Sequence, residues 1–127
     1  MRFMSLVKSK ESKMRPPPKP LMEAIDQLLQ EVGKEGCVMV QAGGLFPTFA
    51  GARVRLDGGK VTVTDGPFTE AKEVVGGYWM LEAKSKQQVM DWMKRCPAQD
   101  GDVIEIRQVF EMSDFPADVQ AAAKKNG

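Results

Sequence analysis

Two segments of the chain carry apolar residues at the spacing of a helix face. In the first, apolar side chains fall on one side and acidic and amide residues on the other; the apolar ones are Leu21, Met22, Ile25, Leu28, Leu29 and Val32. This amphipathic pattern predicts a helix that ends near Gly33 or Gly36. In the second, Ser85 is followed three residues later by Gln88, which matches a capping box. The stripe after it predicts a helix that Pro97 ends, and it consists of Val89, Trp92, Met93 and Cys96.

Six shorter runs are rich in aliphatic and aromatic residues and predict strands. They cover residues 1–7, 37–42, 52–56, 61–63, 78–83 and 103–110. Residues 57–59 (Asp-Gly-Gly) predict a hairpin turn between the third and fourth runs, because glycine tolerates the positive φ of tight β-turns. In residues 52–56 apolar residues alternate with Arg53 and Arg55, so we expect one buried face and one face with both arginines. Further turns are predicted at residues 65–68 and 76–77.

The remaining segments connect or extend these elements. Residues 9–20 are basic and contain consecutive prolines, which predicts a mobile surface loop. We expect one domain over residues 1–112 and a C-terminal tail over residues 113–127. Good helix formers follow Ser113 or Asp114 as a cap, so the tail predicts a short helix. With few apolar residues to anchor it, we expect this helix to fray or to dock on a partner subunit.

The predicted order is strand, helix, strand, hairpin, strand, helix, strand. This order indicates an α+β fold with a ferredoxin-like antiparallel sheet, helices on one sheet face and added hairpin strands. We expect the other face to mix apolar residues with charged ones; the charged ones are Arg53, Arg55, Glu105 and Arg107. A second copy of the same sheet is the simplest cover under two-fold symmetry. We therefore predict a homodimer whose stacked sheets enclose a cavity.

Composition narrows the possible partners. The chain has 127 residues, with 18 Lys and Arg against 17 Asp and Glu, so its formal charge of +1 favours neither nucleic acid nor an anionic membrane. The apolar run at residues 1–7 is too short for a signal-peptide core or a membrane span. We therefore expect a cytoplasmic protein that binds neither nucleic acid nor membrane.

Histidine is absent, and the two cysteines, Cys37 and Cys96, lie far apart without CxxC spacing. Neither a disulfide framework nor a zinc cluster is indicated, and both cysteines are expected to be buried. The lack of histidine also removes the commonest general base near neutral pH and the commonest transition-metal ligand. We expect neither a metal nor another cofactor.

Residues 65–73 (DGPFTEAKE) closely resemble the signature of the DGPF (DGPFAETKE) proteins, a branch of the YCII-related family. Flanking features that look like this family in the same order are residues 43–48, 61–64, 76–78 and 103–107. The resemblance covers roughly residues 1–112. It implies a dimeric α+β barrel with a pocket beside the signature aspartate, in proteins often encoded beside sigma factors of the extracytoplasmic-function type. Better-studied relatives use a histidine and aspartate pair, and only the aspartate carries over, onto Asp65.

Asp65 and Lys72 are the first candidate site residues. In an Asp-Gly-Pro turn the Asp65 carboxylate can accept hydrogen bonds from the turn's own amides, which is the structural interpretation. The functional interpretation is a catalytic or binding carboxylate that deprotonates or holds a small ligand. Lys72 lies among Glu70 and Glu73, and it forms either a surface ion pair or a charge clamp for an acidic ligand.

Arg53, Arg55 and Tyr78 complete the candidate ligand-binding set. The two arginines point to the same side of a strand, where they suit a carboxylate or phosphate, although a solvated or intersubunit salt-bridged face is the commoner arrangement. Tyr78 and Trp79 point to opposite faces, so we expect Trp79 in the core and keep Tyr78 as a pocket hydroxyl.

These residues leave three functions open. The first is a dimeric module that binds an unknown small molecule, with an anion as one option, in a cleft near Asp65. The second is a small-molecule lyase or isomerase with Asp65 as general base and Lys72 or Tyr78 as electrophilic partner. The third, implied by the resemblance alone, is a regulatory partner of an extracytoplasmic-function sigma factor.

Overall fold

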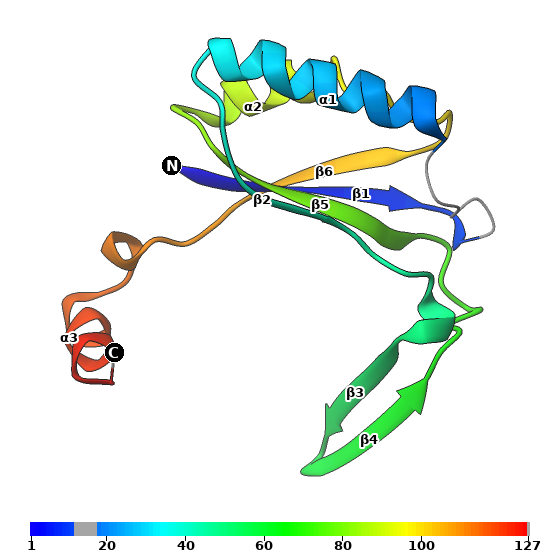
Figure 1. Cartoon of the computed structure of the whole chain (residues 1–127). Helices are drawn as coiled ribbons and strands as arrows, with labels where there is room; N and C mark the ends of the chain where they lie inside the picture. The colour runs from blue at the N-terminus through cyan, green and yellow to red at the C-terminus, as the bar shows by residue number, and fades with distance from the viewer. Residues whose placement is uncertain (12–17, 127) are drawn as a thin grey trace.

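The computed structural model describes residues 1–11 and 18–126. In that part of the chain the elements are β1 (Arg2–Ser9), α1 (Lys19–Lys34), β2 (Val38–Gly44), β3 (Ala52–Asp57), β4 (Lys60–Asp65), β5 (Val74–Glu82), α2 (Lys86–Met93), β6 (Val103–Gln108) and α3 (Ala117–Asn126), with 3-10 turns η2 (Thr48–Ala50) and η3 (Met112–Asp114) (Figure 1). The predicted loop over residues 9–20 is shorter at both ends, because Ser9 closes β1 and α1 begins at Lys19. Residues 12–17 of that loop lie outside the described residues.

Four strands form the main sheet in the order β2-β5-β1-β6, and every neighbouring pair is antiparallel. Helices α1 and α2 cover one face of this sheet, whereas no helix covers the other face in Figure 1. The predicted α+β class with a ferredoxin-like sheet and helices on one side is confirmed.

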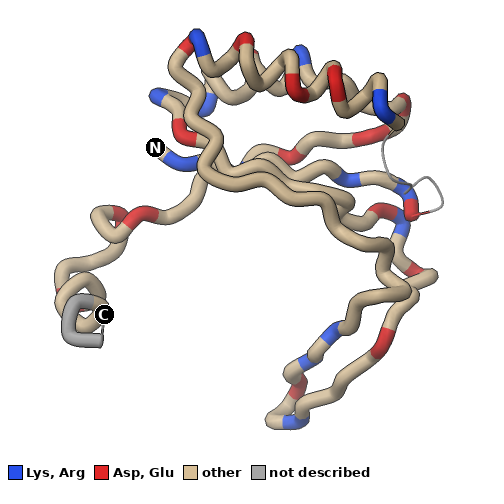
Figure 2. The backbone as a smooth tube through the Cα atoms, in the orientation of Figure 1, with Lys and Arg blue, Asp and Glu red and all other residues tan. Residues whose placement is uncertain are grey.

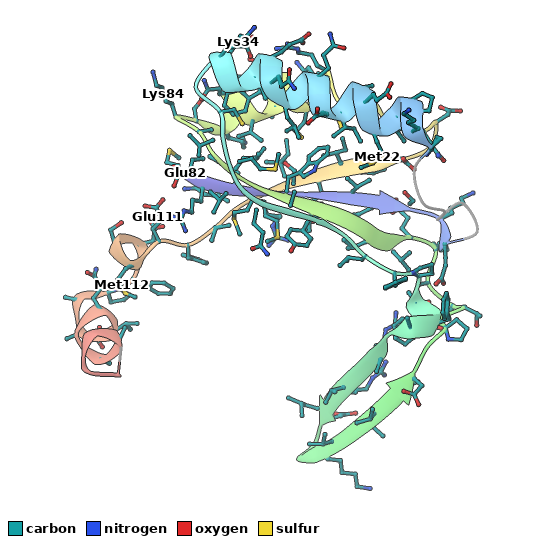
Figure 3. The ribbon with its side chains drawn as sticks, in the orientation of Figure 1. Met22, Lys34, Glu82, Lys84, Glu111 and Met112 are labelled. Atoms are coloured by element: carbon teal, nitrogen blue, oxygen red, sulfur yellow. The ribbon has the colours of Figure 1, made fainter. Side chains whose placement is uncertain are left out.

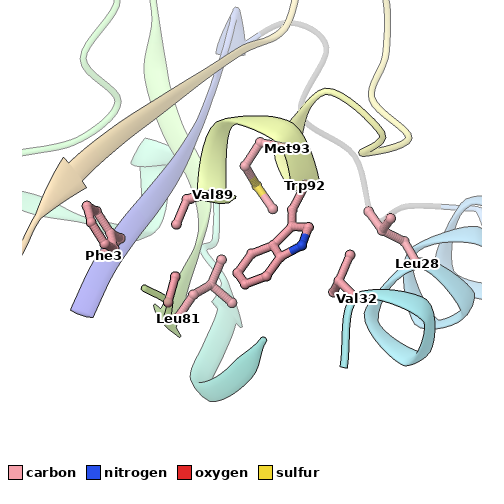
Figure 4. Packing of buried hydrophobic residues seen from close by; sticks show 8 residues of the cluster. Phe3, Leu28, Val32, Leu81, Val89, Trp92 and Met93 are labelled. Carbon is pink, nitrogen blue, oxygen red and sulfur yellow. The ribbon is translucent and has the colours of Figure 1, made fainter. Parts of the chain in front are cut away.

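The core lies between the sheet and the two helices. Phe3 on β1 pairs with Leu81 on β5, and both side chains point toward the helices with at most 1% of their surface exposed. From the helices, the side chains packed against them include Leu28, Val32, Val89, Trp92 and Met93 (Figure 4). Trp79 also packs against this cluster, as predicted from its place opposite Tyr78. The covered face therefore holds the apolar surface that drives folding.

Polar contacts hold the ends of the two helices together. The Ser85 hydroxyl accepts a hydrogen bond from the Gln88 amide at 3.2 Å, which confirms the predicted cap of α2. Glu35, directly after α1, accepts hydrogen bonds from the Trp92 indole at 2.9 Å and from the Arg95 guanidinium at 3.0 Å. These contacts fix α1 and α2 against each other above the sheet.

The predicted turn at residues 76–77 is wrong, because both glycines lie inside β5. Gly77 pairs with Val7 on one side and Gly44 on the other. A Cβ added at Gly77 would lie 3.2 Å from the carbonyl oxygen of Gly43, so the glycine permits a close approach of β2. A glycine pair in the sequence signals a turn and a tight strand contact equally well.

The β3–β4 hairpin forms a separate two-stranded sheet. It extends from the main sheet on the side away from α1 and α2, and the segment that follows β6 extends on that same side (Figure 1). Two predictions are therefore wrong. Arg53 and Arg55 do not lie on the face of the main sheet that the helices leave uncovered, because β3 is not part of that sheet. The apolar face of β3 is not buried within the chain either, since Leu56 is 76% exposed.

Candidate functional site

Signature residues build the junction between the hairpin and the main sheet. The Gly66 amide donates to the Gly51 carbonyl at 2.9 Å, and the Phe68 amide donates to Thr48 Oγ1 at 3.0 Å. The peptide bond between Gly66 and Pro67 is cis. A Cβ added at Gly66 would lie 1.6 Å from the Thr48 carbonyl oxygen, so only glycine fits against η2. The Asp-Gly-Pro-Phe motif thus packs the base of the hairpin onto η2.

Thr48 also connects this junction to the segment after β1. Its backbone amide donates to Glu11 Oε1 at 2.6 Å, and its hydroxyl donates to the same carboxylate oxygen. The hydroxyl therefore donates to Glu11 while it accepts from Phe68. Thr48 thus links the segment after β1 to the signature residues through hydrogen bonds to two groups, the Glu11 carboxylate and the Phe68 amide.

Arg53 is held by residues of its own chain. Its guanidinium carbon lies 3.9 Å from the centroid of the Phe68 ring, in cation–π geometry. The same guanidinium forms an ion pair with Glu70. A backbone hydrogen bond at Glu70 and then the Arg53 guanidinium lower the pKa of the Glu70 carboxyl. Arg53 thus helps to hold the signature segment.

Asp65, the last residue of β4, pairs with Ala52 and is exposed. The two turn amides that follow it donate elsewhere, Gly66 to Gly51 and Phe68 to Thr48. The structural interpretation, in which these amides hold the Asp65 carboxylate, is therefore wrong. The carboxylate is left available for another contact.

Lys72 and Arg55 are exposed. Among the residues that the structure describes, no ion pair joins Lys72 to a carboxylate, so the predicted surface ion pair of Lys72 is not formed there. Arg55 lies on the same face of β3 as Arg53, as predicted, but this face belongs to the projecting hairpin. Both cations therefore flank the junction without belonging to the main sheet.

Tyr78 lies on the uncovered face of the main sheet, opposite Leu6 on β1 and Gly43 on β2. A Cβ added at Gly43 would lie 3.0 Å from Tyr78 Cε1 and 3.2 Å from the hydroxyl oxygen. The ring thus covers Gly43 and is half-buried there. Its place on the opposite side from Trp79 agrees with the prediction.

We use the term open face for the side of the main sheet away from the helices. Its centre is apolar and half-buried, and it consists of Met4, Leu6, Tyr78 and Met80. Ion pairs surround this centre: Arg2–Glu82 at 3.3 Å, Lys8–Glu105 at 3.5 Å and Arg107–Glu105 at 3.6 Å. An apolar centre within a charged rim is the usual anatomy of a protein interface.

A hollow of about 460 Å³ lies at the far end of the open face, where the chain leaves β6. It is lined by Arg2, Glu82, Val109, Phe110, Glu111 and Met112 (Figure 3). Neither Asp65 nor any other residue that the sequence predicted for the site lines this hollow. In the sequence, residues 109–112 look like a continuation of the last strand. The sequence therefore gives no signal that these residues leave the sheet and line a hollow.

The thiols offer no reactive group at neutral pH. Burial raises the pKa of both, that of Cys96 to about 11, so both stay protonated, and both are free and half-buried. The described part of the chain contains no group of three or more Cys, Asp or Glu residues that could hold a metal ion. It also contains no helix with the length and apolar content needed to cross a membrane.

Comparison with known proteins gives two findings. The sequence model of the YCII-related domain matches residues 1–113, which include the core, the hairpin and its junction. The chain is also similar to "Uncharacterized protein R00369" of Rhizobium meliloti (strain 1021), with 33% identity over 73 residues. That alignment spans 58% of this chain and 56% of the relative, so the chain matches little more than half the length of that protein.

Proposed function

The chain belongs to the YCII-related family, and on this premise we propose that it functions as a homodimer that binds a small molecule between its two open faces, near Asp65 and Tyr78. The match over residues 1–113 confirms the resemblance stated from residues 65–73. Dimerisation and ligand binding are proposals that rest on the geometry of the open face.

The observation that carries the proposal is the uncovered apolar centre of the sheet. In this four-stranded sheet one face is packed under helices, while Met4, Leu6 and Met80 on the other face keep part of their surface in water. Burying apolar surface is favourable by about 25 cal/mol per Å². A second copy related by a two-fold axis presents the same apolar centre and the same charged rim, so it is a self-complementary cover.

The proposed ligand contacts come from Asp65, Lys72 and Arg55 at the hairpin and its junction, and from Tyr78 on the open face. The Asp65 carboxylate is not used by its own turn and can accept a hydrogen bond from a ligand donor. Lys72 and Arg55 are exposed cations that suit an anionic ligand group, and the Tyr78 hydroxyl can donate or accept. Two stacked faces would exclude water from the space between them, which strengthens such polar contacts.

A catalytic role is the second candidate, and the same carboxylate favours it. With no histidine in the chain, Asp65 is the group placed to take a proton as general base in a lyase or isomerase reaction. The regulatory partnership with a sigma factor derives from the resemblance alone and stays a prediction.

Tyr78 is the single tyrosine of the sequence, so it gives a direct test of ligand binding. In protein labelled with 13C-tyrosine, a panel of small carboxylates, phosphates and amines is titrated while the one ring signal is recorded. We expect at least one compound to shift this signal saturably at about 1 mM or below. If no compound shifts it at about 10 mM, the binding proposal fails.

Asp65→Asn then separates binding from catalysis. Binding through the carboxylate predicts an affinity about tenfold weaker in this variant, whereas a purely catalytic role predicts unchanged binding and lost turnover of the bound compound. Asp26→Asn on the outer surface of α1 is the matched control, and it should leave the titration unchanged.

A further inference from the structure

The hollow at the end of the open face brings charges of both signs beside apolar side chains. Arg2 on β1 and Glu82 on β5 are paired across the two strands, so both side chains point to the same side of the sheet. The apolar part of the lining is Val109, Phe110 and Met112. The volume of about 460 Å³ is in the range of sites that bind small molecules. One chain supplies this whole lining, so the hollow does not depend on the proposed homodimer.

The ion pair between Arg2 and Glu82 uses only part of each side chain. Arg2 Nε donates to Glu82 Oε1 at 3.3 Å. Within residues 1–11 and 18–126, no group accepts a hydrogen bond from the two terminal nitrogens of Arg2, and none donates to Glu82 Oε2. Solvent reaches 52% of the Arg2 side chain and 44% of the Glu82 side chain. The terminal nitrogens form a fork that can bind a carboxylate by two parallel hydrogen bonds, and Oε2 can accept from an ammonium group.

The apolar wall of the hollow is held in place by its own chain. The Val109 amide donates to the Arg2 carbonyl at 2.9 Å, which fixes the start of the wall against β1. The Phe110 ring lies 5.3 Å from the Phe115 ring, yet Phe110 is still 72% exposed. Met112, which follows in the same wall, is 47% exposed. The wall is therefore a preformed apolar surface, and covering it with an apolar ligand group would be favourable.

The charges around the hollow indicate which class of ligand fits. Arg2 contributes one positive charge, and Glu82 and Glu111 contribute two negative ones. Glu111 Oε1 also lies 4.0 Å from the amino group of Met1. Figure 2 shows basic residues at the start of β1 and acidic ones on the segment that leaves β6. A plain anion would meet two carboxylates and a plain cation would meet a guanidinium, whereas a zwitterion finds a partner for each of its charges.

We propose that the hollow binds a small zwitterion with an apolar side chain, that is, a free α-amino acid of the aromatic or aliphatic kind. Its carboxylate binds the fork of Arg2, and its ammonium group donates to Glu82 Oε2. Its side chain lies against Phe110 and Met112. Bound in this way, the ligand extends the Arg2–Glu82 pair into a group of four alternating charges. This site is separate from the one proposed near Asp65.

Three probes with the same phenyl group test the inference. Phenylalanine has both charges, 3-phenylpropanoate has only the carboxylate, and 2-phenylethylamine has only the ammonium group. Each is titrated into protein labelled with 13C at its methionine methyl groups, and the Met112 signal is assigned with Met112→Leu. We expect phenylalanine to shift this signal saturably with a dissociation constant of about 1 mM. Each single-charge probe should bind at least about fivefold more weakly.

Two variants then separate the two charged contacts. Arg2 and Glu82 lie outside the core, so Arg2→Gln and Glu82→Gln should both fold. Arg2→Gln should weaken phenylalanine binding about fivefold without weakening 2-phenylethylamine, and Glu82→Gln should weaken both without weakening 3-phenylpropanoate. Arg107→Gln is the matched control, because Arg107 lies on the open face outside the lining of the hollow. Equal weakening by Arg2→Gln and Arg107→Gln would contradict a specific carboxylate contact.

The remaining outcomes overturn the inference. A single-charge probe that binds as tightly as phenylalanine shows that one charge is enough, and no shift of the Met112 signal by phenylalanine at about 10 mM shows that the hollow does not bind it. The Tyr78 ring signal distinguishes this site from the proposed function. If phenylalanine shifts the Tyr78 signal but not that of Met112, the hollow is excluded and the proposed function stands. If Met112 responds while Tyr78 responds to no compound, the proposed function fails and the hollow stands.

Discussion

The two faces of the main sheet are made by the same strands, yet they differ in what covers them. On the covered face, Phe3 and Leu81 lie under two helices and are almost fully buried. On the open face, the neighbouring residues Met4 on β1 and Met80 on β5 remain partly in water. The covered face thus holds the core of one chain, whereas the open face leaves apolar surface that its own chain does not cover.

The largest expected effect contrasts neighbours on β5. Leu81→Ala leaves a cavity in the core and should lower the free energy of unfolding by about 3 kcal/mol at any protein concentration. Met80→Ala, on the open face, should lower the free energy of unfolding measurably only at protein concentrations where the proposed dimer forms. Chemical denaturation at two concentrations, tenfold apart, makes the comparison. If both variants lose the same free energy of unfolding at both protein concentrations, the two faces do not differ in the way proposed.

The hairpin junction is tested by a pair of glycines. Gly66→Ala would place a Cβ against the Thr48 carbonyl oxygen, so the hairpin base must shift at a cost of about 2 kcal/mol. Gly44→Ala is the control, because its Cβ would meet nothing within 4 Å. Thermal unfolding measures both, and similar melting temperatures for the two variants would show that the signature glycine does not position the hairpin.

Ser5 gives a smaller effect of opposite sign. Its hydroxyl is fully buried on the covered face and finds no hydrogen-bond partner among the described residues. Ser5→Ala removes this unsatisfied group and should raise the free energy of unfolding by about 1 kcal/mol. Ser9→Ala is the matched control: its hydroxyl donates to Asp102 at 2.8 Å, so its loss should destabilise the protein. Destabilisation in both variants would mean that the Ser5 hydroxyl is satisfied.

The smallest expected effect is at Asp65. Because the turn amides donate to Gly51 and Thr48, Asp65→Asn should change the free energy of unfolding by less than about 0.5 kcal/mol. Equilibrium denaturation checks this value. A decrease in the free energy of unfolding above about 1 kcal/mol would show that the Asp65 side chain stabilises its turn.

Much of the covered face could be predicted from the sequence. The stripe from Leu21 to Val32 and the Ser85 cap specify their helices locally, since helix periodicity and capping depend on residues close in the chain. The placement of Trp79 and Tyr78 on opposite faces follows from the geometry of a strand.

The hairpin and its junction could be predicted only in part, because their geometry depends on contacts between distant segments. The hairpin predicted around residues 57–59 is confirmed, but the alternation in residues 52–56 indicates an apolar face without indicating what covers it, so the sequence does not predict that this hairpin forms a separate sheet. The role of Gly66 requires the position of Thr48, and the availability of Asp65 requires the partners of the turn amides. None of these contacts has a signal in the local sequence.

The mass of the protein in solution tests the central claim most directly. Sedimentation equilibrium at micromolar concentration should give twice the 14.0 kDa mass of one chain, because the open face is then covered by a second copy. A mass of 14.0 kDa that persists across the micromolar range would contradict the account.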